Sequence, residues 1–173
     1  MEFTFETVYN QKALTTMARG LRKTVRKKKN RRSHILGWFV VVLAILLSIS
    51  GDEGFGVSAR AVVTWLVTAI IVVTLIWEDA INAYAARKRM LPGTERASSV
   101  FREEGYETTT DVGKTEWKYD KIQRLAETKE YFVFIFNQNH AQVYDKNSIS
   151  GGTVEEFGAF IEKVTDKHIE KIR

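Results

Sequence analysis

Two long apolar blocks interrupt an otherwise polar and charged chain. They cover residues 35–49 and 61–77, and neither block contains Asp, Glu, Lys or Arg. A helix rises about 1.5 Å per residue, so crossing a hydrocarbon core of about 30 Å takes roughly 20 residues. Neighbouring residues that tolerate an interface extend both blocks toward that length. The pattern predicts transmembrane helices at 35–50 and 61–79.

The connection between the two blocks predicts an antiparallel hairpin. Residues 51–60 hold three glycines, at 51, 54 and 56, which suit a short external loop. Two other interpretations fit less well. A cleaved signal peptide is not followed by a second apolar block, and the rest of the chain is too short to surround two buried helices.

Basic residues give the predicted hairpin its orientation, because Lys and Arg concentrate on the cytoplasmic side of membrane proteins. Ten precede the first block without an acidic residue among them, and Arg87, Lys88 and Arg89 follow the second. The intervening loop offers Arg60 against Asp52 and Glu53. Both termini are therefore expected in the cytoplasm.

The N-terminal segment, residues 1–34, combines a strand pattern with a helix pattern. Phe3 and Phe5 alternate with polar residues over 2–9, as in a half-buried strand. Such a strand needs a sheet to join, and we expect the sheet to come from the C-terminal domain. Asn10 is a candidate N-cap. After it, the apolar residues of an amphipathic helix are Leu14, Met17, Ala18, Leu21 and Val25.

The basic end of this helix is a candidate site for anionic lipid headgroups, where each Lys or Arg near the surface contributes about 1 kcal/mol. The candidate residues are Arg22, Lys23, Arg26, Lys27, Lys28, Lys29, Arg31 and Arg32. Two alternatives are that the run only sets the membrane topology and that it binds a protein partner. Nucleic acid is the least favoured partner.

The second apolar helix is expected to continue as a stalk and linker over 80–96 and to stop before Pro92. Residues 97–173 then predict a separate β-rich domain. Its short strands are expected at 97–102, 106–112, 114–118, 124–128, 131–137 and 140–144, separated by turn-forming residues. The run 131–137 is the most apolar of these and is expected to be central.

A terminal helix should cover this sheet. Thr153 and Glu156 have the spacing of a capping box. The apolar face that follows is formed by Phe157, Phe160, Ile161, Val164 and Ile172. The predicted fold class is therefore an α+β membrane protein, in which a two-helix hairpin is inserted between the N-terminal segment and an antiparallel sheet capped by a helix.

Three motifs resemble the YcxB-like membrane proteins of bacteria. They are WKYDKI at 117–122, ETKEYFVF at 127–134 and VYDK at 143–146, where Asp145 replaces the proline that is usual in the family. The resemblance implies a pleckstrin-homology-like fold, a curved sheet closed by a C-terminal helix. It also implies a location in the bacterial cytoplasmic membrane, and it implies no general activity.

The residues that carry chemistry are sparse. Cysteine is absent, and His34, His140 and His168 are scattered without metal-ligand spacing. No glycine-rich phosphate loop is present, so no catalytic, cofactor or metal site is predicted. The adjacent acids Glu78 and Asp79 are a candidate for lining a pore.

Trp117 and Tyr119 are candidates for a surface that binds a partner, since aromatic residues often anchor interfaces. In a domain this small, packing in the core is the favoured role for Trp117, and the role of Tyr119 stays open. The leading functional hypothesis is a non-enzymatic, membrane-anchored cytoplasmic binding module of unknown ligand, which engages a protein partner, a second copy or the lipid surface. The alternatives are a protein that protects its host against a bacteriocin or toxin, and an oligomeric channel or transporter subunit.

Overall fold

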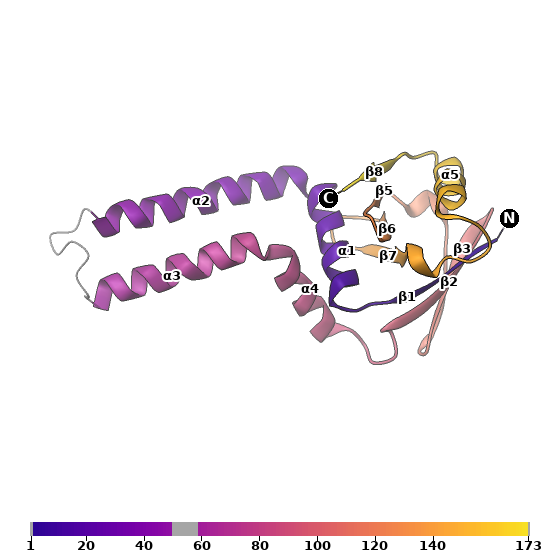
Figure 1. Cartoon of the computed structure of the whole chain (residues 1–173), viewed down its shortest axis with the longest axis horizontal. Coiled ribbons are helices and arrows are strands. Elements are labelled where there is room, and N and C mark those ends of the chain that lie inside the picture. The colour runs from indigo at the N-terminus through magenta and orange to yellow at the C-terminus, as the bar shows by residue number, and fades with distance from the viewer. Residues whose placement is uncertain (1, 50–58, 173) are drawn as a thin grey trace.

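The computed structural model describes residues 2–49 and 59–172, and most of the predicted external loop at 51–60 lies outside them. A β-rich body lies at one end of the molecule and a long helical hairpin projects from the other (Figure 1). The combination of helices with largely antiparallel sheets confirms the α+β class.

The N-terminal strand joins the C-terminal domain. β1 (Phe3–Val8) pairs antiparallel with β2 (Arg96–Arg102), and the register sets Phe3 opposite Phe101 and Val8 opposite Arg96. β3 (Gly105–Thr110) and β4 (Gly113–Trp117) complete this sheet, which we call sheet A, in the order β1-β2-β3-β4. The predicted pairing of residues 2–9 is confirmed, and the hairpin is thus an insertion within one folded body.

A second sheet, sheet B, packs against the first. Its order is β7-β6-β5-β8, formed by β5 (Arg124–Glu127), β6 (Tyr131–Ile135), β7 (Ala141–Asp145) and β8 (Ile169–Lys171). β6 is buried along its whole length, as expected for a central strand. β8 adds in parallel to β5, and this was not predicted.

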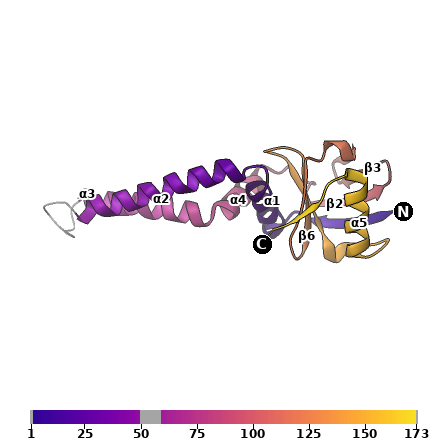
Figure 2. The ribbon, with the colours of Figure 1, turned by 90° about the horizontal axis from the view of Figure 1, so that it is seen from above.

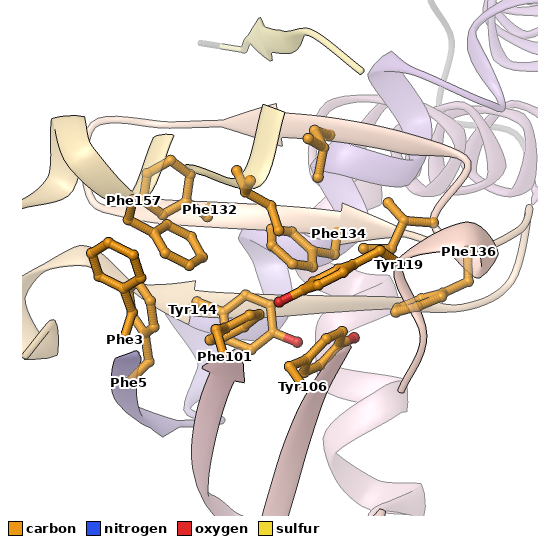
Figure 3. Packing of buried hydrophobic residues seen from close by; sticks show 13 residues of the cluster. Phe3, Phe5, Phe101, Tyr106, Tyr119, Phe132, Phe134, Phe136, Tyr144 and Phe157 are labelled. Carbon is orange, nitrogen blue, oxygen red and sulfur yellow. The ribbon is translucent and has the colours of Figure 1, made fainter. Parts of the chain in front are cut away.

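Aromatic side chains fill the space between the sheets (Figure 3). Phe5 packs edge-on against Phe157, with ring centroids 4.6 Å apart, and Phe101 packs against Tyr144 at 5.0 Å. Phe157 belongs to α5 (Val154–Thr165), which covers one end of the core and begins with the predicted capping box. The 3₁₀ turn Tyr119–Lys121 lies between β4 and β5 and so connects the two sheets, and a second one, Lys146–Ser148, lies between β7 and α5.

Ile172 does not extend the apolar face of α5, so that part of the prediction was wrong. The helix stops at Asp166, which adopts a left-handed conformation with φ of 53°. The chain then extends into β8, and the Ile172 amide donates to the Glu127 carbonyl at 2.8 Å. Its side chain is buried on the opposite face of sheet B.

That opposite face is covered by α1 (Gln11–Lys23), whose N-cap is Asn10 as predicted: its side chain accepts from the Ala13 amide at 2.9 Å. Gly20 lets the helix approach β6 closely, because a Cβ there would lie 2.7 Å from Cγ1 of Val133. α1 is therefore a third layer on the sandwich.

The hairpin consists of α2 (Lys27–Ile49) and α3 (Ala59–Ile76), which pack along their length (Figures 1 and 2). α2 is the one described helix that alone is long and apolar enough to cross a membrane. The segment 61–76 qualifies only when counted together with α4 (Glu78–Arg89) as one broken span.

The chain bends by 82° between residues 61–76 and α4. The prediction of a continuous helix through residues 80–90 was therefore wrong. α4 turns at Trp77 and packs beside α1, so it forms part of the base on which the hairpin stands. The physical reason lies in Asp79 and Ala83, which are buried toward α1 and hold α4 there.

The close approach of α1 to β6 is testable with two matched substitutions of helical glycines. Gly20→Ala should lower the free energy of unfolding by about 1 kcal/mol, because overpacking against Val133 outweighs the gain in helix propensity. Gly158→Ala should raise it by about 0.5–1 kcal/mol, since its Cβ would meet Ile169 Cδ1 at an ordinary 3.8 Å. Chemical denaturation of the purified full-length chain measures both, and equal effects would contradict the close contact.

Candidate functional site

A cavity of about 560 Å³ lies between the β3–β4 hairpin, β7 and the two helices α1 and α4. Sheet A, sheet B and the base of the helical hairpin all contribute to it. Its main lining residues are Met17, Ala86, Met90, Thr94, Thr108, Thr110, Thr115, Trp117, His140 and Gln142. The volume is that of a small-ligand or peptide side-chain pocket.

Gln142 is the most firmly positioned polar residue of the cavity. Its side-chain oxygen accepts from the hydroxyl of Tyr106 at 2.7 Å and from that of Tyr144 at 2.5 Å. Burial raises the pKa of both tyrosines, so both remain neutral donors. With its oxygen engaged twice, Gln142 keeps its amide nitrogen as a donor for a ligand.

Trp117 forms an aromatic wall. Its ring stacks on His140, with centroids 5.5 Å apart and planes 21° apart, and contacts Phe136 at 4.9 Å. Within the described part of the chain, its indole N–H is the one buried side-chain polar group without a hydrogen-bond partner. Buried donors are normally satisfied, so this N–H is a candidate donor to a bound acceptor.

The cavity carries little charge. Lys114 is the one Lys or Arg among its described lining residues, and its ammonium is paired with Glu107 at 2.6 Å. Burial lowers the pKa of His140, which keeps the imidazole neutral near pH 7. β4, which carries Lys114, forms one edge of sheet A. An uncharged ligand with hydrogen-bonding groups fits this lining best.

The two predicted partner-surface residues fall in different places. Trp117 lines the cavity, whereas Tyr119 is buried with 6% exposure and donates its hydroxyl to the Arg102 carbonyl at 2.6 Å. Tyr119 is therefore a core residue, because it closes the aromatic cluster beside Tyr106. Sequence reasoning missed Gln142 altogether, since a single glutamine in a strand carries no recognisable signal.

The predicted headgroup-binding run divides into two groups. Arg22 is paired with Asp79, and Arg26 donates to the Gln138 carbonyl at 2.6 Å and to Asn139 at 3.0 Å. Lys23 also has an interaction partner. The exposed basic residues at the start of α2 are Lys27, Lys28, Lys29, Arg31 and Arg32. These five stay candidates for headgroup binding.

Asp79 and Glu78 connect the helices at the base of the hairpin. Asp79 receives two hydrogen bonds from Arg22, at 2.7 and 2.6 Å, and lies 3.6 Å from Arg19. Glu78 pairs with His34 of α2 at 2.8 Å. The two acids, candidates for lining a pore, thus fasten α4 to α1 and to α2.

Among residues 2–49 and 59–172, no group of three or more His, Asp or Glu side chains is arranged to hold a metal ion. The family model of the YcxB-like protein matches residues 101–161. This range contains Trp117, His140 and Gln142 but excludes the hairpin, α1 and α4. No curated protein matches the chain.

The two hydrogen bonds from Arg22 to Asp79 should hold α4 against α1. Asp79→Asn should destabilise the α1–α4 contact by about 2 kcal/mol, because two arginines lose a mostly buried counterion. Hydrogen exchange of the α4 amides measures this as faster local opening. The control Glu2→Gln removes the exposed pair with Arg102 and should change stability by less than about 0.5 kcal/mol. Unchanged exchange in Asp79→Asn would contradict the role of the pair.

Proposed function

We propose that this protein is a non-enzymatic, membrane-anchored binding module of the YcxB-like family. In this proposal α2 and α3 both cross the cytoplasmic membrane of a bacterium, and the two sheets lie in the cytoplasm. The cavity beside Trp117 binds the ligand. The two-sheet body with α5 at one end supports a pleckstrin-homology-like fold for it.

The exposed surface of the hairpin supports the two-span arrangement. Large apolar side chains cover both helices, including Leu36 at 63%, Leu47 at 66% and Ile70 at 64% exposure. Soluble monomers rarely expose contiguous apolar patches of this extent, because the hydrophobic effect opposes it. Basic residues at 27–32 and 87–89 flank the hairpin where it meets the sheets. By the positive-inside rule, that end faces the cytoplasm.

The cavity beside an edge strand is the observation that carries the binding role. An extended peptide that pairs with the free edge of β4 would place a side chain next to Trp117. The Gln142 amide and the indole N–H of Trp117 are donors for peptide carbonyls. The nearly neutral lining favours small uncharged or apolar ligand side chains over acidic ones. We therefore assign an extended, uncharged polypeptide segment as the ligand class.

The membrane arrangement is testable by single-cysteine labelling, which the cysteine-free chain allows without background. Asp52→Cys, in the predicted external loop, should react in intact cells with a membrane-impermeant maleimide. Lys129→Cys, exposed on the β5–β6 turn, should react only after permeabilisation. Protection of Asp52→Cys in intact cells, or recovery of the chain in the soluble fraction, would overturn the two-span arrangement.

The binding role is testable with a displayed library of random peptides, selected on the full-length chain in lipid nanodiscs. Enriched peptides should lose about tenfold affinity, about 1.4 kcal/mol, in Trp117→Phe, which keeps one aromatic ring but removes the pyrrole ring with its N–H. Trp77→Phe is the matched control. Trp77 is exposed and is not among the residues that line the cavity, so this variant should bind the peptides normally. Failure to enrich any peptide, or equal affinity in Trp117→Phe, would count against the proposed site.

A further inference from the structure

α4 presents two opposite faces. One face, formed by Asp79, Ala83 and Ala86 and followed by the C-cap residue Met90, lies toward α1 and the cavity. The residues Trp77, Ile81, Tyr84 and Lys88 recur at the i, i+4, i+7 and i+11 spacing of a single helix face. We call these four residues the outer stripe.

The apolar members of the outer stripe are exposed rather than packed. Trp77 is 53% exposed, Ile81 42% and Tyr84 56%. The Lys88 ammonium lies over the Tyr84 ring, 4.8 Å from its centroid. An exposed Trp and Tyr beside a lysine is the composition found where a protein meets lipid headgroups, since these side chains have an apolar body and a polar tip.

The bend at Trp77 sets the direction in which the outer stripe faces. Residues 61–76 and α4 differ in direction by 82°, so α4 lies nearly parallel to the bilayer surface if α3 crosses the bilayer. α4 sits between the hairpin and α1 in both views (Figures 1 and 2). Because its inner face contacts α1, the outer stripe faces the side from which the hairpin projects.

Charge on the same side complements an anionic surface. α4 ends with the exposed residues Arg87, Lys88 and Arg89, and α2 begins with five more exposed basic residues at 27–32. The nearest acids, Glu78 and Asp79, are paired with His34 and Arg22. The base of the hairpin therefore presents mainly positive charge to the headgroup region.

We propose that α4 is an interfacial helix, which inserts its outer stripe into the headgroup region of the anionic cytoplasmic leaflet. This inference rests on the proposed two-span hairpin and adds a third lipid contact to it. Amphipathic helices of this kind bind through buried apolar area together with basic residues. Since Ala86 of α4 and its C-cap residue Met90 also line the cavity, the helix holds the binding site directly at the membrane surface.

Spin labelling of single cysteines in the full-length chain tests the proposal, in vesicles of phosphatidylethanolamine and phosphatidylglycerol. Labels at Ile81→Cys and Tyr84→Cys should show intermediate accessibility to both oxygen and a water-soluble nickel chelate, as at an interface. Thr109→Cys, exposed on the outer face of sheet A, should be accessible mainly to nickel. Replacing phosphatidylglycerol with phosphatidylcholine should raise the nickel accessibility of the two α4 labels.

Val42→Cys, on the exposed surface of α2, reports the hairpin independently and should be accessible mainly to oxygen. If Val42 reports the bilayer core while the α4 labels match Thr109, the interfacial helix is wrong and the hairpin stands. If the α4 labels are shielded from both reagents, a protein covers the outer stripe and the proposal is also wrong. A water-accessible Val42 would overturn the hairpin and the interfacial helix together.

Discussion

The pairing of β1 with β2 is the constraint on which the rest of the structure depends. It joins residues 3–8 to residues 96–101 and so returns the chain to its starting point after the hairpin. Phe3 and Phe5 thereby enter the core between the sheets, where they meet Phe101 and Phe157. Without this pairing sheet A would lose an edge strand, and α1 would lose the connection that places it on sheet B.

A second set of contacts joins the two sheets to the helical hairpin. Gly20 seats α1 on β6, and Arg22 on the same helix holds Asp79 of α4. Glu78, the residue before Asp79, pairs with His34 of α2. The path from the aromatic core to the hairpin therefore runs through packed or charge-paired side chains.

The sequence predicted what repeats locally and missed what depends on tertiary partners. Three features were recognisable in the sequence, because each is a short-range pattern. They are the alternation at Phe3 and Phe5, the caps at Asn10 and Thr153, and the apolar run of β6. The bend at Trp77 and the parallel strand β8 were missed, since burial of Asp79 and of Ile172 selects them.

The same limit applies to the cavity. Trp117 was recognisable as an aromatic that could bind a partner, but Tyr119 two residues later is a core residue, and the two look alike in sequence. Gln142 gains its importance only from two tyrosine hydroxyls contributed by different sheets. The separation of β8 from α1 along the chain bears on biosynthesis. Ile172 helps form the surface on which α1 rests, so that surface is complete only once residue 172 has been translated, long after α1 has left the ribosome.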